Sequence, residues 1–152
     1  MNECVDFVKK KAVIIHQSDY SLTRLAAPDK NLGDLPATKN DKVNATEIAR
    51  GFNIPDSDII YIEDMPREDM EKVFEKVCRE LNIYSKARQR TFLLVYAAGH
   101  GIADSVQFMV TNATSGNVFP IEDNLRSYCK GLKNYCTIFA IYDMCKSEKQ
   151  GY

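Results

Sequence analysis

Apolar residues along the chain fall into two kinds of pattern, short continuous runs and helical stripes. Four runs are apolar along almost their whole length, at residues 12–15, 59–62, 91–97 and 137–142. A run of this kind is typical of a strand buried on both faces inside a parallel sheet. The clearest stripe repeats at helical spacing and predicts one long amphipathic helix; its members are Met70, Val73, Phe74, Val77 and Leu81.

Weaker patterns complete the expected order of elements. A modest helix is expected to begin near Asp41, and Pro120 is expected to open another. Residues 17–41 are rich in turn-forming residues and indicate one long loop, and residues 106–110 a short strand or hairpin arm. Because strands alternate with helices, the fold class is α/β, with a mostly parallel sheet covered by helices on both faces.

Length and charge set the general class of protein. The chain has 152 residues, enough for one domain over residues 1–152, and its net charge is −1. A balanced charge gives no reason to expect nucleic acid as a partner. No apolar run approaches the roughly 20 residues of a membrane span, and the first residues do not look like a signal peptide. We therefore expect no membrane partner and a cytoplasmic location.

Cysteine spacing and glycine placement argue against metal and cofactor chemistry. The five cysteines include no Cys-x-x-Cys pair of the kind that binds zinc. Cys78 and Cys129 lie on helix faces and are expected in the core. No glycine-rich phosphate loop follows the first strand, which counts against a nucleotide or flavin binder. The sequence thus predicts no metal and no cofactor.

Two reactive side chains follow neighbouring apolar runs. His100 comes after the third run and Cys145 after the fourth, 45 residues later. Ligands of open α/β sheets bind beyond the carboxyl ends of strands, so both residues are expected at one edge of the sheet. An imidazole can take the proton of a thiol and later protonate a leaving amine. The N–H groups of Gly101 and Cys145 could then bind the oxyanion.

Several short motifs around these two residues resemble one known family. The chain resembles the caspase-like cysteine peptidases, the group of caspases, metacaspases and paracaspases, and paracaspases most closely. The resemblance covers roughly residues 12 to 147. It rests on the histidine motif, the segment after it, the cysteine motif and two features before the first helix: Tyr96-Ala-Ala-Gly-His-Gly101, Phe108-Met-Val110, Ile141-Tyr-Asp-Met-Cys145, Leu35-Pro-Ala37 and Asp41.

The resemblance implies a role for each matched residue. His100 corresponds to the general base and Cys145 to the nucleophile of a cysteine endopeptidase. Asp41 and Asp143 correspond to acidic residues of the S1 pocket, which selects Arg or Lys before the cleaved bond. Strand alternation places positions 143 and 145 on the same side, and a carboxylate there could pair with a basic substrate side chain.

Other features depart from the family pattern and leave a second interpretation open. Ala97 stands where relatives usually have an aromatic residue, and Lys146 where paracaspases have Arg. The family fold continues with small-subunit strands, whereas only seven residues follow Cys145 here. We therefore expect a large-subunit-like portion, incomplete at its carboxyl end, whose last strand is an unpaired apolar edge. A second chain or a homo-oligomer would cover that edge, and a catalytically silent scaffold or subunit is the alternative function.

Overall fold

The computed structural model describes residues 6–26, 28, 32–102, 108–110, 118–130 and 135–147, and at 102, 108–110, 118 and 145–147 it describes the backbone alone. Four parallel strands lie side by side in the order β2-β1-β3-β6. Their bounds are Lys9–His16 for β1, Ile59–Glu63 for β2, Thr91–Ile102 for β3 and Cys136–Ser147 for β6. The expected parallel sheet is confirmed.

A small antiparallel extension continues the sheet at the end of β3. Strand β4 (Phe108–Val110) pairs with the last residues of β3, and β5 (Val118–Pro120) pairs with β4. The expected hairpin arm is confirmed for residues 108–110, and residues 106 and 107 lie outside the described residues. Strand β5 was not expected.

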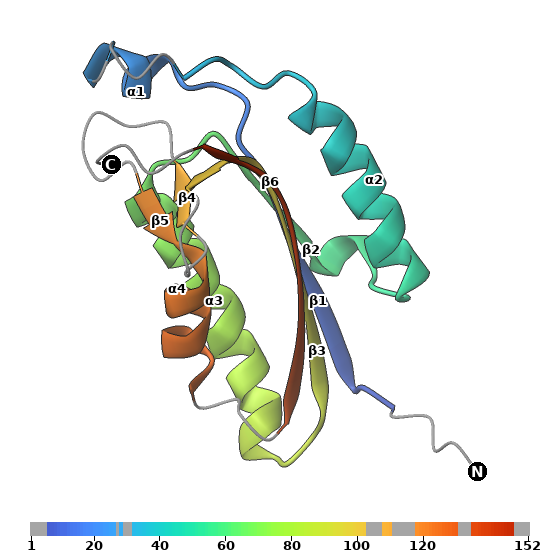
Figure 1. Cartoon of the computed structure of the whole chain (residues 1–152). Coiled ribbons are helices and arrows are strands. Elements are labelled where there is room, and N and C mark those ends of the chain that lie inside the picture. The colour runs from blue at the N-terminus through green and yellow to red at the C-terminus, as the bar shows by residue number, and fades with distance from the viewer. Residues whose placement is uncertain are drawn as a thin grey trace.

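Helices cover both faces of the sheet (Figure 1). Helix α2 (Thr38–Gly51) packs on one face, and α3 (Arg67–Lys86) and α4 (Ile121–Tyr128) pack on the other. A short 3-10 turn, η2 (Asp56–Asp58), precedes β2. Helix α1 (Ser21–Ala26) lies beyond the carboxyl ends of the strands. The sheet with helices on both faces is the architecture that the alternating pattern predicts.

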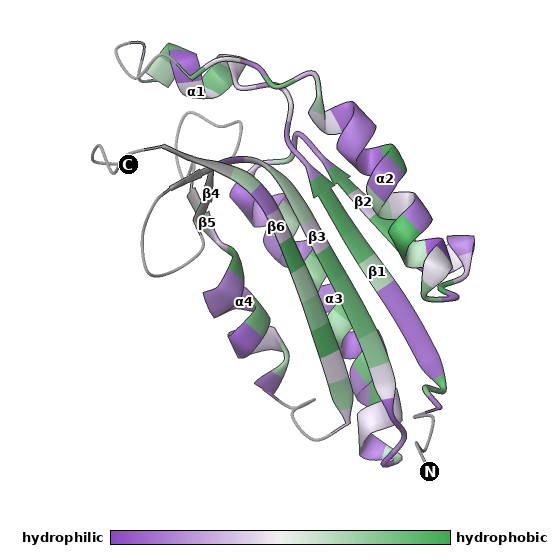
Figure 2. Cartoon of the chain, turned by 45° about the vertical axis from the view of Figure 1, so that its right-hand side comes forward, coloured by the Kyte–Doolittle hydropathy of each residue, from purple (hydrophilic) through white to green (hydrophobic). Residues whose placement is uncertain are grey.

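The hydrophobic runs and the stripe explain why these elements pack together. Side chains alternate along β1: Ala12 and Ile14 face α2, whereas Val13 and Ile15 face α3. The strands are therefore hydrophobic over most of their length (Figure 2). The apolar stripe of α3 packs against the sheet, and its buried members are Met70, Phe74, Val77 and Leu81.

Three boundaries differ from the sequence-based expectation. The expected loop 17–41 contains α1, and α2 begins at Thr38, before Asp41. Strands β3 and β6 are longer than the apolar runs because their pairing continues to Ile102 and Ser147. His100 and Cys145 consequently lie within the last residues of these strands and not in loops after them. Backbone pairing between neighbouring strands compensates for the weak strand propensity of glycine there.

Candidate functional site

The register of β3 and β6 brings the two predicted reactive positions together. His100 is the register partner of Cys145, and Ala98 is the partner of Asp143. Neighbouring strands lie about 4.8 Å apart, and parallel register keeps paired positions on one face. That face is the one covered by α2, because Tyr96 and Ala98 belong to its hydrophobic cluster. The expected meeting of the two strand ends at one edge is therefore present in the backbone.

Two residues, Tyr20 and Gly33, hold His100 in place from outside the sheet. Its backbone N–H donates to the hydroxyl of Tyr20 at 2.8 Å, and the two rings meet edge to face with centroids 4.6 Å apart. The ring Nε2 lies 2.8 Å from the carbonyl oxygen of Gly33. A carbonyl only accepts, so Nε2 carries the proton of the neutral ring and Nδ1 is the unprotonated nitrogen.

The chain between β1 and α2 brings Tyr20 and Gly33 to His100. Its first residues are anchored on Asp64, which accepts from the N–H groups of Ser18 and Asp19 at 2.7 and 3.0 Å. Leu35 N–H donates to the Ser18 carbonyl at 2.8 Å, which closes the segment on itself. These bonds give the segment a defined backbone position beside the strand ends.

An ion pair fixes the same segment near Gly33. Arg24 lies 2.6 Å from Asp34, and the Asp34 carboxylate also accepts the Tyr20 N–H at 3.0 Å. The hydrogen bond from Arg24 and the one from Tyr20 hold the pKa of Asp34 below its ordinary value. Tyr20 is fully buried beneath this pair. Tyr20 and Gly33 were missed in the sequence, where only a lone aromatic residue in a polar stretch marks this position.

The two predicted S1 carboxyls meet on the α2 face. Asp41, in the first turn of α2, lies close enough to Asp143 of β6 for the two carboxyls to interact. Tyr96 donates its hydroxyl to Asp143 at 3.0 Å. Burial and the neighbouring Asp143 raise the pKa of Asp41, because a second negative charge is unfavourable there. Burial and the bond to Asp143 likewise raise the pKa of Tyr96.

The proximity of the two carboxyl groups favours a positively charged ligand at this position. Two neighbouring carboxylates repel each other, and a positive group between them would compensate both charges. Asp143 is exposed, so a ligand can approach it from solvent. Asp143 lies two residues before Cys145 on β6, on the same face by strand alternation.

Gly101 has a different environment from a glycine in an open loop. It is buried within β3, with Met109 of β4 as one register partner and Lys146 of β6 as the other. Its N–H and that of Cys145 stay predictions as oxyanion donors. The side chain of Cys145 lies outside what the structure describes.

A second histidine lies near the site without facing solvent. His16, the last residue of β1, is only 1% exposed, and its Nε2 lies 4.0 Å from a carboxylate oxygen of Glu63. Within the part of the chain that the structure describes, neither ring nitrogen has a hydrogen-bond partner. Burial lowers the pKa of His16, so the ring is neutral at neutral pH.

No cluster of three or more His, Cys, Asp or Glu side chains that could hold a metal ion occurs among the described residues. No helix within that part of the chain combines the length and the apolar content that crossing a membrane needs.

Comparison with known proteins adds no relative. No protein-family model matches the chain, and a search of curated proteins finds no match. The functional interpretation therefore depends on the motifs of this sequence and on the geometry described above.

Proposed function

We propose that this protein is a cysteine endopeptidase of the caspase-like group, which cleaves peptide bonds after Arg or Lys through a thioester acyl-enzyme. The observation that carries the proposal is the register of β3 with β6, in which His100 is paired with Cys145. The α/β sheet with helices on both faces is compatible with a caspase-like sandwich. The motifs quoted above supply the family resemblance.

The proposed reaction uses the two ring nitrogens of His100 differently. Nε2–H stays bonded to the Gly33 carbonyl, and Nδ1 takes the proton of the Cys145 thiol. The thiolate attacks the substrate carbonyl, and the tetrahedral intermediate collapses as the imidazolium protonates the leaving amine. Water, deprotonated by the same nitrogen, then hydrolyses the thioester and regenerates the thiol. The N–H groups of Gly101 and Cys145 are proposed to bind the oxyanion.

The acidic pair supports the proposed preference for a basic substrate residue. A guanidinium or ammonium group placed between Asp41 and Asp143 would relieve the repulsion that raises the pKa of Asp41 and form charge-assisted hydrogen bonds. Arg suits the position better than Lys because its planar fork can bond two oxygens at once. An Asp side chain would meet like charge and be rejected.

Active-site labelling tests the proposal directly. A peptide ending in Arg and carrying a thiol-reactive group is expected to modify Cys145, located by peptide mapping with mass spectrometry. The same reagent ending in Asp should label far more slowly, and Cys136→Ala should label as the unmodified protein does. Equal labelling by both reagents would refute the S1 assignment, and no labelling by the Arg reagent would refute the endopeptidase.

The outer edge of β6 favours a second candidate, a scaffold or subunit of a larger assembly. Among the described residues β6 pairs with β3 alone. Two apolar side chains of β6 are exposed to solvent, Ile138 by 37% and Phe139 by 48%. An unpaired apolar strand edge is suited to accept a strand from another chain. A second chain or a homo-oligomer is therefore proposed to cover this edge.

Sedimentation of the full chain tests this second candidate. The protein is expected to form an oligomer whose mass depends on concentration, and Ile138→Lys is expected to shift it toward monomer. His100→Ala is the matched control, because it changes the site and leaves the edge intact. A protein that remains monomeric at every concentration would contradict covering of the edge by a second copy.

A further inference from the structure

Two thiols from different helices lie side by side on the face opposite the candidate site. The Sγ atom of Cys78, in α3, is 3.3 Å from the Sγ atom of Cys129, the residue that follows α4. Both side chains are buried, with 4% and 7% exposure, as the sequence predicted for them. The residues are 51 positions apart, so the pair joins two separate segments.

The geometry requires only a small movement to become a disulfide. A disulfide bond is about 2.05 Å long, so the two sulfurs must approach by about 1.2 Å. Rotation of the two side chains, with a slight shift of α4, can supply a change of this size. Because Cys129 lies just beyond the end of α4, its backbone is less constrained than a position inside a helix.

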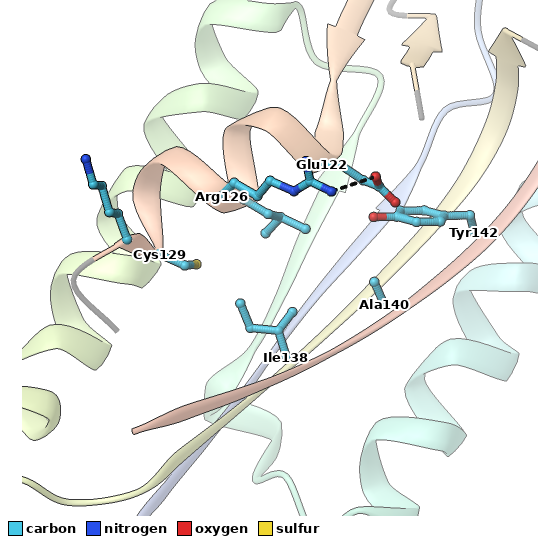
Figure 3. Close-up of a pocket in the computed structure, with 8 residues that line it drawn as sticks. Glu122, Arg126, Cys129, Ile138, Ala140 and Tyr142 are labelled. Atoms are coloured by element: carbon cyan, nitrogen blue, oxygen red, sulfur yellow. Dashed lines mark ion pairs between the residues drawn. The ribbon is translucent and has the colours of Figure 1, made fainter. Parts of the chain in front are cut away.

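One of the two thiols can be reached from solvent. A pocket of about 440 Å³ lies between α4 and β6, and Cys129 is among its lining residues (Figure 3). Leu125 and Ile138 also line it, and Arg126 pairs with Glu122 at 3.9 Å. Cys78 is not among the lining residues. A small reagent entering this pocket therefore meets Cys129 first.

We propose that Cys78 and Cys129 form a reversible oxidation site that reacts with low-molecular-weight disulfides such as oxidised glutathione. The Cys129 thiolate attacks one sulfur of the reagent, which forms a mixed disulfide and releases one glutathione thiol. The Cys78 thiolate then attacks the Cys129 sulfur, which closes the protein disulfide and releases the second glutathione. Two electrons pass from the two cysteines to the reagent, and their two protons end on the released thiols.

Local electrostatics support this order of attack. The hydrogen bond from Cys78 lowers the pKa of Cys129 below its ordinary value. The same bond and burial raise the pKa of Cys78. Cys129 is also the sulfur that lines the pocket, so its thiolate is the one that meets the reagent and acts as the nucleophile in thiol–disulfide exchange.

The proposal is independent of the endopeptidase. Cys129 and its pocket lie on the α3 and α4 face, whereas His100 is on the α2 face. Oxidation would join α3 to α4 and restrict the unfolded chain over the 51 positions that separate the two cysteines. Formation of the link and its effect on unfolding can therefore be measured without any assay of peptide cleavage.

The experiment treats the reduced full chain with oxidised glutathione and maps the products by mass spectrometry. The expected product contains a peptide in which Cys78 is linked to Cys129, two hydrogens lighter than the sum of the two reduced peptides. Its Tm should rise by about 5–10 °C and return to the starting value when dithiothreitol is added. Cys136→Ala is the matched control and should form the same link.

Two single variants separate the steps. Cys78→Ala is expected to stop at the mixed disulfide and retain one glutathione on Cys129. Cys129→Ala should leave Cys78 unmodified, because the thiol that lines the pocket is gone. Circular dichroism confirms that each variant is folded. Oxidation that leaves both thiols free in the folded wild-type protein, or that links either one to Cys136 instead, would overturn the proposal.

Discussion

His100→Ala is expected to lower kcat/KM for an Arg-terminated peptide substrate by about 10³-fold or more. The variant removes both the group that takes the thiol proton and the group that protonates the leaving amine. Its neighbour in the strand register, Cys145, keeps its backbone position because the pairing of β3 with β6 does not use the ring. Cys145→Ala should lower turnover to the residual rate that the rest of the site supports, and initial rates with a fluorogenic peptide measure both effects.

The double variant provides a sharper check than either single one. If His100 and Cys145 act as a unit, combining the two alanines should cost no more than Cys145→Ala alone. Multiplicative losses would indicate that the two residues act separately, and the dyad assignment would then be wrong. Unchanged activity in His100→Ala would have the same consequence.

The substitution Tyr20→Phe tests how His100 is positioned and is expected to have a smaller effect than His100→Ala. This change keeps the ring that meets His100 edge to face and removes the hydroxyl that accepts its N–H. Since Tyr20 positions His100 without contacting substrate, we expect kcat to fall by about tenfold with little change in KM. The pH dependence of kcat should also shift, because the ring is held less firmly against the Gly33 carbonyl. A purely structural role would lower Tm and leave that pH dependence unchanged.

The fold was predictable where burial requires a simple pattern of apolar residues in the sequence. Strands covered on both faces must be apolar along their length, and the stripe from Met70 to Leu81 must face the sheet. The ends of β3 and β6 have no such apolar pattern. Residues around His100 are small or polar, and they are strand because the partner strand 45 residues away continues beside them. Such pairing is a tertiary effect that local propensity does not contain.

Sequence motifs indicated which side chains belong to the candidate site, but they did not indicate which backbone groups contact them. The motifs placed His100 and Asp143 near neighbouring strand ends, and the structure brings Asp41 close to Asp143. The carbonyl that bonds the imidazole belongs to Gly33, 67 positions before His100. Any residue type has a carbonyl, so nothing in the residue identities could point to this one. Its place depends on how the segment between β1 and α2 closes on itself.

Asp143→Asn is expected to lower kcat/KM for an Arg substrate by about 10- to 100-fold and to leave substrates with a neutral residue in that position nearly unchanged. The amide keeps the size of the side chain and removes its charge, so the guanidinium loses one charge-assisted partner. Each tenfold change corresponds to about 1.4 kcal/mol, in the range for a charge pair that substrate binding partly desolvates.

Two controls separate charge from packing at this position. Tyr96→Phe removes the 3.0 Å hydrogen bond to Asp143 and retains the carboxylate, so the Arg preference should survive. Glu63→Gln removes a carboxylate at the end of β2, whose register partner is His16 and not His100, and should have little effect. Equal losses for Arg and neutral substrates in Asp143→Asn would contradict a role in selecting charge.

Stability and selectivity for Arg should both depend on pH if Asp41 and Asp143 form the S1 pocket, whereas a pocket without carboxyl groups would give no such dependence. The pKa of Asp41 is raised above its usual 3.8, so the folded state holds its proton more tightly than the unfolded state does. The resulting contribution to stability is fully present below the unfolded pKa and is lost as pH rises through the folded pKa. Selectivity for Arg should change in the opposite direction, because a cation binds best once Asp41 has lost its proton.

Asp41→Asn tests both trends in one variant. It should remove the fall in the free energy of unfolding that accompanies the titration of Asp41, measured by urea unfolding between pH 3 and 7 at about one-unit steps. It should also lower the Arg preference at neutral pH, because one of the two carboxylates is gone. If stability lost its pH dependence while the Arg preference stayed intact, the pair would be a structural feature of the α2 face and S1 recognition would have to involve other residues.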